Sequence, residues 1–364
     1  MEITLKEHEK LLYTLRELYR QYGYHSFRMS KFEKYELYAG NKDFLVSDRV
    51  ITFNDLNGDL LALKPDVTLS IVRNATFRPG WKQKLYYQEN VYRPSGSSRR
   101  FREILQCGLE CIGDLDSYDL YEVLHLAVRS LRTISEKSVL SVSHLGILKS
   151  LFKELEAGDE AQAELMRLVA ARNLHELDAL FSRENWETKL LKDLEALLQL
   201  SCSLKELPAR LNAMRLNWLD PAVRKELEDL SALAREEDSI LCFDLSVIND
   251  IHYYNGIVFR GFVQGISEKV LSGGRYDSLL ARMQKKGSAM GFAIYFGVLE
   301  QMLRKAETWD ADLLLLYDEK TPLTRVRDLI EQHQREGHSV SAQRSAGEGR
   351  YRETLDIRGG KSDA

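Results

Sequence analysis

The sequence lacks long apolar runs, paired cysteines and a large excess of either charge. No stretch is long and apolar enough to span a membrane, and the first ten residues are charged, without the apolar core of a signal peptide. The four cysteines show no CxxC spacing, so they favour buried thiols over disulfide bonds or a zinc site. From these absences we expect a cytoplasmic protein with no membrane anchor, no metal and no cofactor.

The formal net charge is -4 at pH 7, which gives no general attraction to nucleic acid. The chain has 364 residues, of which 44% are hydrophobic and 29% charged, as in an ordinary globular protein with two or three domains. No internal repeat, heptad run or low-complexity segment stands out. Function must therefore be sought in local motifs rather than in bulk composition.

The most informative stretch runs from residue 84 to residue 113. Two extended runs flank a loop at 94–100 that is rich in turn-forming residues, so the runs should pair as antiparallel strands. Side chains alternate along the second run. One face carries residues that can pack on helices: Leu105, Cys107, Leu109 and Cys111. The other face carries Gln106, Gly108 and Glu110, and a glycine within a strand often marks a close approach to the backbone.

The polar face of this run indicates a binding site. Gln106 and Glu110 together suit a ligand with an ammonium group or a ring N–H. A cluster of arginines lies beside them: Arg93, Arg99, Arg100 and Arg102. Such a cluster suits a phosphate or a carboxylate, and it could also be a docking face for a partner. The alternative for both groups is an exposed sheet face with solvated charges.

The N-terminal part of the chain predicts a helix and a hairpin. Residues 5–22 carry the apolar stripe of an amphipathic helix. Residues 51–68 predict a hairpin that turns at an Asn-Gly pair. The hairpin leaves Asp66 and Thr68 near a strand end, where Asp66 could equally cap the following helix.

The middle of the chain alternates between helical and extended patterns. Residues 118–136 predict a helix, and the Leu-, Glu-, Ala- and Lys-rich residues 148–236 predict a helical subdomain inserted between strands. Residues 251–263 predict a second hairpin that turns at an Asn-Gly pair, with two tyrosines at its lip. Residues 272–283 predict a Gly-rich turn into a helix, which by itself is weak evidence for phosphate binding.

The C-terminal part, from residue 311, predicts one βαβ unit. A polar tail follows, in which only residues 354–357 suggest a strand. We therefore divide the chain into a domain at 1–306, with its helical insertion at about 150–237, and a short α/β segment at 307–364.

In their order along the chain, these motifs resemble those of the class II histidyl-tRNA synthetase fold over roughly residues 5–306. The resemblance rests on LKPDVT at 63–68, RFRE and QCGLE within 100–110, HYYNG at 252–256, GGRYD at 273–277 and GFAI at 291–294. It implies an α+β fold, with an antiparallel sheet flanked by helices. It also implies a histidine pocket made of Asp66, Thr68, Gln106, Glu110, Tyr254 and Tyr276.

Two departures from that family concern arginines. Asn249 stands where the histidine-specific peptide of the family carries an arginine, and Val298 stands where the third motif carries the arginine that clamps ATP. Loss of one preorganised donor to a developing charge typically costs roughly 3–4 kcal/mol. A further departure is that the family ends in a complete anticodon-binding domain, whereas this chain has a single βαβ fragment.

With these departures, the chain is similar to the regulatory subunits of ATP phosphoribosyltransferase. That resemblance implies a noncatalytic chain that supports the short-form catalytic subunit in the first step of histidine biosynthesis and takes part in feedback inhibition by histidine. It also implies a homodimer within a hetero-octamer, and no binding of tRNA. Two alternatives are a histidyl-tRNA synthetase with relocated arginines and a free-standing histidine-binding adaptor.

Overall fold

The computed structural model describes residues 5, 7–42, 45, 49–94, 100–248, 253–304 and 309–360. The chain divides into two compact units. One unit spans Glu9–Leu299, and the other combines Met1–His8 with Glu300–Ala364. Each unit is described by itself below. Among the described helices, none combines the length and the apolar character needed to cross a bilayer.

The larger unit is built on a mostly antiparallel sheet, which in the described residues has nine strands in the order β1-β5-β6-β12-β11-β10-β7-β9-β8. The strands are β1 (His25–Ser26), β5 (Lys82–Pro94), β6 (Phe101–Gly113), β7 (Ser138–His144), β8 (Cys202–Ser203), β9 (Leu241–Phe243), β10 (Ile257–Val263), β11 (Leu271–Arg275) and β12 (Ser288–Tyr295). The two runs predicted around residues 84–113 are β5 and β6, and they pair antiparallel. The predicted α+β class with an antiparallel sheet is therefore confirmed.

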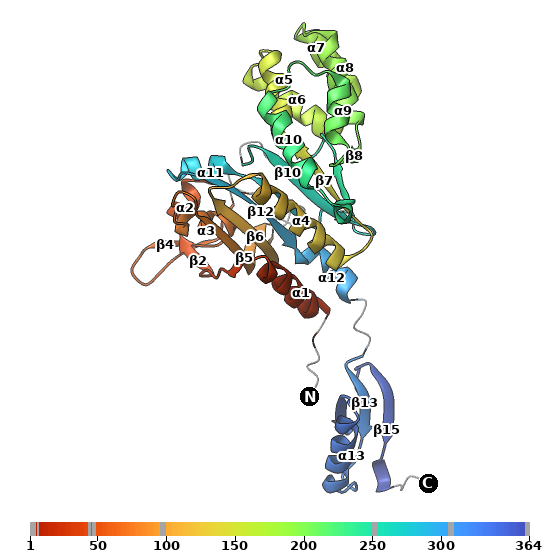
Figure 1. Ribbon diagram of the computed structural model, residues 1–364. Helices are drawn as coiled ribbons and strands as arrows, with labels where there is room; N and C mark the ends of the chain where they lie inside the picture. Colours follow the sequence, from red (N-terminus) through yellow and green to blue (C-terminus); the bar gives the residue numbers. More distant parts are fainter. Residues whose placement is uncertain are drawn as a thin grey trace. The chain divides into compact units, whose positions relative to one another are not determined.

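Helices α1 (Glu7–Gln21) and α4 (Ser117–Ile134) lie over one face of this sheet (Figure 1). A 2.9 Å hydrogen bond joins the hydroxyls of Tyr19 in α1 and Ser130 in α4. The Tyr19 ring packs edge-on against Phe292 of β12, with 6.1 Å between the ring centroids. The β6 residues predicted to pack on helices are buried at Cys107, Leu109 and Cys111. The alternate residues of β6 therefore face the other side of the sheet.

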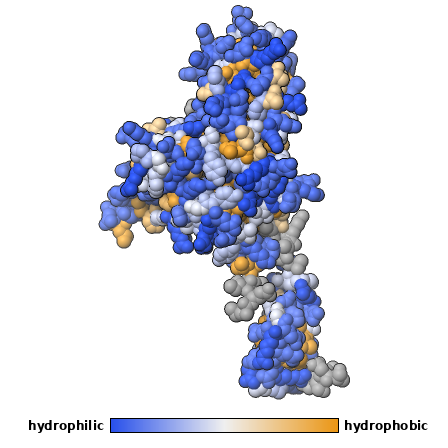
Figure 2. All heavy atoms as spheres, viewed as in Figure 1, coloured by the Kyte–Doolittle hydropathy of each residue, from blue (hydrophilic) through white to orange (hydrophobic). Residues whose placement is uncertain are grey.

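A small sheet and two short helices lie beside this one. In the described residues the sheet has the order β2-β4-β3, from β2 (Phe32–Lys34), β3 (Thr52–Asn54) and β4 (Leu60–Leu63). The hairpin predicted at 51–68 is the β3–β4 pair, and Gly58 at its turn has the left-handed φ of 85° that favours glycine. The helices are α2 (Glu36–Ala39) and α3 (Thr68–Asn74). Several large apolar side chains are exposed on this sheet and on the β3–β4 turn: Phe32, Phe53, Leu56 and Leu60. Figure 2 shows hydrophobic atoms at the left of the molecule, where Figure 1 places β4.

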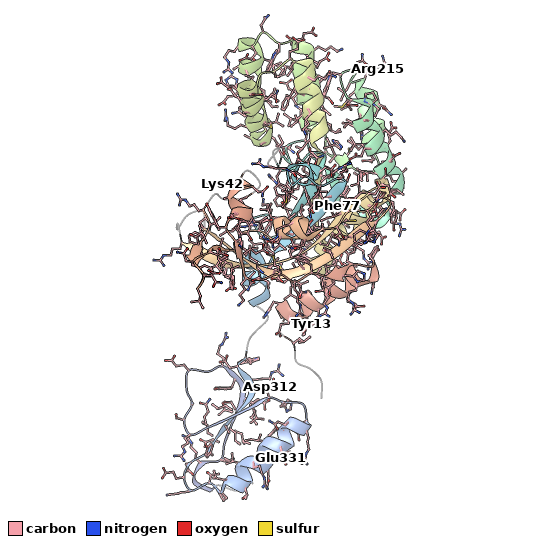
Figure 3. All side chains as sticks on the ribbon, turned by 90° about the vertical axis from the view of Figure 1, so that its left-hand side faces the viewer. Tyr13, Lys42, Phe77, Arg215, Asp312 and Glu331 are labelled. Carbon is pink, nitrogen blue, oxygen red and sulfur yellow. The ribbon has the colours of Figure 1, made fainter. Side chains whose placement is uncertain are left out.

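The helical insertion predicted at about 150–237 corresponds to six helices among the described residues. They are α5 (Leu145–Glu154), α6 (Asp159–Ala171), α7 (Leu174–Arg183), α8 (Thr188–Gln199), α9 (Leu207–Met214) and α10 (Pro221–Leu233), followed by the 3-10 turn η2 (Glu236–Asp238). Figure 3 shows the insertion extending away from the sheet, with Arg215 at the end of α9. Of these helices, α10 packs on α4 and so lies against the sheet-bearing body.

The turn predicted at Asn255 and Gly256 is not a hairpin, so that prediction was wrong. In the sheet, β7 lies between β9 and β10, and β10 pairs with β7 and β11. The Asn255 side chain instead holds the start of α11 (Asp277–Arg282), because its Oδ1 accepts a 2.7 Å hydrogen bond from the Asp277 backbone N–H.

For residues 272–283 we predicted a Gly-rich turn that leads into a helix. The helix is present as α11, but the prediction of a turn at the glycines was wrong. Gly273 and Gly274 lie inside β11, paired on both sides with neighbouring strands. Their function is close packing, since a Cβ added to Gly274 would lie 2.6 Å from the Tyr254 ring.

The smaller unit contains a three-stranded parallel sheet in the described residues, in the order β14-β13-β15. The chain reaches it through α12 (Phe296–Arg304), and its elements are β13 (Ala311–Leu316), α13 (Leu323–Arg335), β14 (Val340–Gln343), β15 (Tyr351–Asp356) and the 3-10 turn η3 (Arg358–Gly360). Figure 3 shows Asp312 on β13 and Glu331 on α13. The tail was predicted to be mostly loose, but six of its residues form β15. It is held there because Ile357 is buried with Leu315 and Val326 in a small apolar core.

Candidate functional site

A cavity of about 290 Å³ lies on the face of the sheet opposite α1 and α4. All six residues that the resemblance assigned to a pocket line it: Asp66, Thr68, Gln106, Glu110, Tyr254 and Tyr276. They come from the β4–α3 junction, from β6 and from the segments that precede β10 and α11. The β4–α3 junction, β6 and the two segments before β10 and α11 are far apart in sequence, and the sheet brings them together.

On its sheet side the cavity is lined by three small residues, Ser272, Gly291 and Ala293. On β6, Gly108 lies between Gln106 and Glu110, as predicted, and across the sheet it pairs with Ala293. Glu110 pairs with Gly291, which pairs in turn with Gly274. A Cβ at Gly291 would overlap the Glu110 carboxylate, and one at Gly108 would lie 2.7 Å from the Tyr87 hydroxyl oxygen. Gly108 and Gly291 therefore leave room for the Tyr87 ring and the Glu110 carboxylate to approach the sheet closely.

Glu110 is the central polar group of the cavity and is only 2% exposed. Its Oε1 accepts a 2.7 Å hydrogen bond from the Thr68 hydroxyl, and its Oε2 accepts a 2.6 Å hydrogen bond from the Tyr276 hydroxyl. Burial raises the pKa of Glu110 to about 8, although both hydrogen bonds lower it. The carboxyl is therefore largely protonated at pH 7, and a cationic ligand group beside it would favour the ionised form.

Asp66 and Arg93 form a second polar group. Arg93 donates to the Pro65 carbonyl at 2.6 Å and contacts the Asp66 carboxylate at 3.4 Å. The other Asp66 oxygen accepts a 2.9 Å hydrogen bond from the Leu69 backbone N–H, so the residue does hold the first turn of α3. Burial raises the pKa of Asp66, and Arg93 lowers it in part. Asp66 thus has a capping contact and faces the cavity as well.

Three tyrosines form an aromatic wall. The Tyr253 ring lies 4.6 Å from the Tyr254 ring and 5.8 Å from the Tyr276 ring, measured between centroids. Burial raises the pKa of all three hydroxyls well above the ordinary value, so they stay protonated and can act as donors. Such a wall suits a flat ring or an alkyl stem of a ligand.

The predicted arginine cluster is divided by the structure. Arg93 lines the cavity, whereas Arg100 and Arg102 are exposed and are not among its lining residues. Arg99 lies outside the described residues, and so does Asn249, where the family's arginine was expected. Val298 lies in the first turn of α12 and does not line the cavity.

Sequence reasoning missed two cations that line the cavity, Arg260 on β10 and Lys269 in the loop before β11. Arg260 is the one charged residue in the otherwise apolar strand IVFRGFV. An isolated charge in such a strand was the available signal. The strand order that carries it to the cavity is not visible in the sequence.

An ion-pair network connects the helical insertion to the wall of the cavity. Glu226 of α10 accepts a 3.0 Å hydrogen bond from Arg275 and lies 3.2 Å from the His144 ring. Burial opposes ionisation of Glu226, yet the contacts with His144 and Arg275 hold its pKa below the ordinary value. Because Arg275 directly precedes Tyr276, the insertion is tied to a residue of the cavity.

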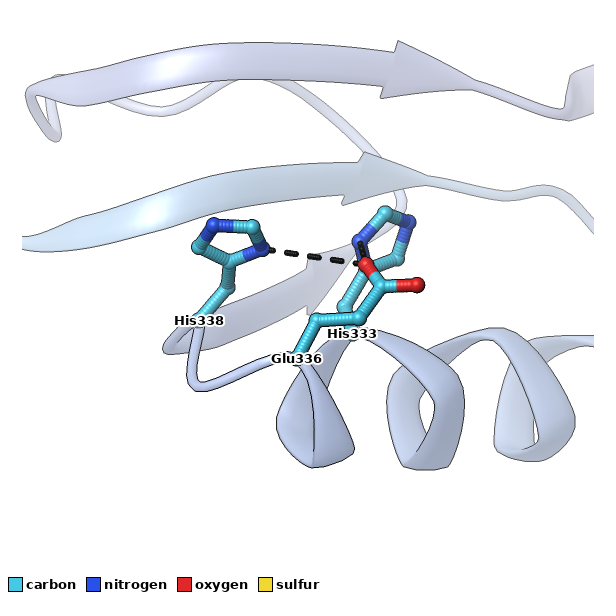
Figure 4. Close-up of side chains that lie close together, drawn as sticks. All are labelled: His333, Glu336 and His338. Carbon is cyan, nitrogen blue, oxygen red and sulfur yellow. Dashed lines mark ion pairs between the residues drawn. The ribbon is translucent and has the colours of Figure 1, made fainter. Parts of the chain in front are cut away.

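One group in the described residues could hold a metal, and it lies in the smaller unit (Figure 4). His333 Nδ1 lies 3.3 Å from Glu336 Oε2, and His338 Nδ1 lies 3.9 Å from the same oxygen. Two imidazoles and a carboxylate form a donor set that suits Zn²⁺. Sequence reasoning considered only the cysteines as zinc ligands and missed this group.

Comparison with known proteins agrees with the fold. The family model described as histidyl-tRNA synthetase matches residues 2–299. The chain is 31% identical to the ATP phosphoribosyltransferase regulatory subunit of Caldanaerobacter subterraneus subsp. tengcongensis over 290 residues, which is 77% of this chain and 74% of that relative.

Two solved structures share the fold at 22% sequence identity. The first, an ATP phosphoribosyltransferase regulatory subunit/histidyl-tRNA synthetase from Bacillus halodurans, gives a TM-score of 0.75 over 99% of this chain and 97% of that one. The second, from the ATP phosphoribosyl transferase (HisG:HisZ) complex of Thermotoga maritima, gives a TM-score of 0.62 over 81% of this chain and 98% of that one.

The fold is that of a class II synthetase-like protein of the histidyl-tRNA synthetase type. Within this class, the chain belongs to the family of ATP phosphoribosyltransferase regulatory subunits.

Proposed function

We propose that this chain is the noncatalytic regulatory subunit of ATP phosphoribosyltransferase and that it binds histidine in the cavity beneath Tyr253, Tyr254 and Tyr276. In this proposal the chain supports the catalytic subunit in histidine biosynthesis and carries the feedback signal. The observation that carries the proposal is the combination of a buried acid, Glu110, at an aromatic cavity with Val298 at the position of the ATP-clamping arginine.

The contacts of the cavity suit a histidine side chain. Glu110 can accept from an imidazole N–H, and the buried amide of Gln106 lies on the same face of β6. The tyrosine wall can stack on the ring. Feedback then requires that histidine bind one quaternary arrangement of the enzyme more tightly than another.

The proposed partner is the short-form catalytic subunit, with the regulatory chain as a homodimer inside a hetero-octamer. The exposed arginines Arg100 and Arg102 form a positively charged surface that could meet that partner. We propose the cytoplasm as the compartment, because all four cysteines are unpaired thiols. Binding of tRNA is not part of the proposal.

Reconstitution tests the assignment. The purified chain, mixed with the short-form catalytic subunit, should restore ATP phosphoribosyltransferase turnover, and histidine should then inhibit it. The chain alone should show no histidine-dependent exchange of pyrophosphate into ATP. Exchange by the isolated chain would support the synthetase alternative, and histidine binding with no effect on the catalytic subunit would support the free-standing adaptor.

A further inference from the structure

The cavity has an acidic end and a basic end. Glu110 and Asp66 mark the first, and Arg260 and Lys269 mark the second. We propose that Arg260 and Lys269 form a subsite for the α-carboxylate of the ligand, so that the cavity selects a zwitterionic amino acid over a cationic amine. This inference rests on the proposed function, because it assumes that a histidine-like ligand occupies the cavity.

The register of the sheet sets the distance between the two ends. Arg260 pairs with Ser272, which pairs with Ala293, which pairs with Gly108 on β6. Glu110 lies two residues further along β6, on the same face. Three strand spacings and one two-residue step separate the Cα atoms of Arg260 and Glu110 by about 16 Å. By this register Arg260 and Glu110 lie on the same face of the sheet, and both line the cavity, which occupies the gap between them.

The residues between the two ends are small, so the gap is not filled from below. Ser272, Ala293 and Gly291 line the cavity between Arg260 and Glu110. At about 290 Å³ the cavity is close to the lower limit of the ~300–1,000 Å³ typical of ligand sites. This size fits an amino acid better than a nucleotide.

The two cations are placed at the same end by different elements. Arg260 donates a 2.8 Å hydrogen bond to the Ile248 carbonyl, which orients its guanidinium. The Lys269 ammonium lies 5.8 Å from the centroid of the Tyr295 ring, which also lines the cavity. Burial lowers the pKa of Lys269, and the charges of Arg260 and Arg93 lower it further. A bound anion relieves this repulsion.

Arg93 is less suited to this task, although it also lines the cavity. Its guanidinium already donates to the Pro65 carbonyl and contacts the Asp66 carboxylate. The carboxylate of a ligand would have to compete with Asp66 for it. The Asp66 carboxylate therefore offsets the charge of Arg93, and the proposed subsite consists of Arg260 and Lys269.

The experiment compares two ligands that differ in the carboxylate. Histidine and histamine, which lacks the carboxylate, are titrated by calorimetry into the full chain as wild type, Arg260→Met, Lys269→Met and the double variant. The exposed Lys192→Met on α8 is the matched control. Histamine binding also reports whether each variant keeps a folded acidic end.

We expect wild type to bind histidine at least 10-fold more tightly than histamine. The double variant should bind histidine about 10- to 100-fold more weakly, as expected for the loss of charged hydrogen bonds, and histamine within about twofold of wild type. The histidine affinity of each single variant should lie between those of wild type and the double variant, and Lys192→Met should match wild type.

Other outcomes overturn the inference. If wild type binds the two ligands equally, or if the double variant loses both equally, the cations do not select the carboxylate. If ATP or inorganic phosphate binds wild type and only this binding is lost in the double variant, the basic end serves phosphate instead. If wild type binds neither histidine nor histamine, the proposed function fails together with this inference.

Discussion

The two ends of the cavity differ in how far they could be predicted from the sequence. The acidic end is centred on Glu110 of β6, a strand where Gln106, Gly108 and Glu110 alternate with buried apolar residues. The basic end combines Arg260 of β10 with Lys269 of the following loop, three strands away. The comparison shows that a site carried by local alternation can be found in a sequence, whereas a site assembled by strand order cannot.

The largest expected effect comes from filling the floor at the acidic end. Gly291→Ala would place a Cβ where the Glu110 carboxylate and the Leu109 carbonyl lie. Because both are part of the packed sheet, we expect a loss of about 2–4 kcal/mol in the free energy of unfolding and at least 100-fold weaker histidine binding. Denaturant unfolding and calorimetry measure the two effects.

Gly297→Ala is the matched control for this variant, since nothing lies within 4 Å of a Cβ at that position in α12. It should leave both quantities close to wild type. A Gly291→Ala protein that binds histidine normally would show that the acidic end is not part of the site.

The second effect is a pH dependence that only the acidic end should have. Because the pKa of Glu110 is raised to about 8, the folded chain holds one more proton than the unfolded chain between the ordinary pKa and about pH 8. Its contribution to stability is therefore complete below the ordinary pKa and is lost as the pH rises through about 8. Relative to Glu110→Gln, wild type should lose roughly 1 kcal/mol of unfolding free energy per pH unit from pH 5.5 to 7.5.

Chemical denaturation of both proteins at several pH values measures this difference. A variant of the basic end is the control: the unfolding free energy of Arg260→Met should depend on pH in the same way as that of wild type. A constant difference between wild type and Glu110→Gln across the range would mean that Glu110 is ionised throughout.

A smaller effect is expected where the insertion meets the cavity wall. Glu226→Gln weakens the contact with Arg275, which precedes Tyr276, and so loosens a wall that both ends share. We expect histidine binding to weaken by about 3- to 10-fold, with a modest loss of stability. Asp229→Asn, which weakens the pair with Lys225 on the same helix and a 3.3 Å contact with Ser117 of α4, both away from the cavity wall, is the control and should have no effect on histidine binding. If Glu226→Gln binds histidine as tightly as wild type, the helical insertion does not contribute to the site.

The smallest effect concerns an arginine outside both ends. Arg102→Met removes one exposed charge from β6 and leaves the cavity intact. If this surface meets the catalytic subunit, the association rate should fall by about two- to fivefold at low salt and converge with wild type at high salt. Surface plasmon resonance at several salt concentrations measures it, and histidine affinity should not change. An unchanged association rate at every salt concentration would exclude Arg102 from the partner surface.

Much of the fold could be predicted because its signals are local. The alternation in β6, the Asn-Gly turn of the β3–β4 hairpin and the helices of the insertion depend on residues near one another in the sequence. Gly273 and Gly274 were misread as a turn, because a Gly-Gly pair looks the same in a tight strand as in a loop. The strand β15 was largely missed for a related reason, since its residues are mostly exposed and polar and form a strand through pairing with β13, which is distant in the sequence.

The most direct test of the central claim is a histidine titration of the full chain by calorimetry, with wild type, Glu110→Gln and Glu103→Gln compared. Glu103 lies on the same strand as Glu110 but is exposed. The account predicts one site per chain in wild type and in Glu103→Gln, and at least 10-fold weaker binding in Glu110→Gln. Equal affinities in all three proteins would contradict it, because histidine would then bind elsewhere.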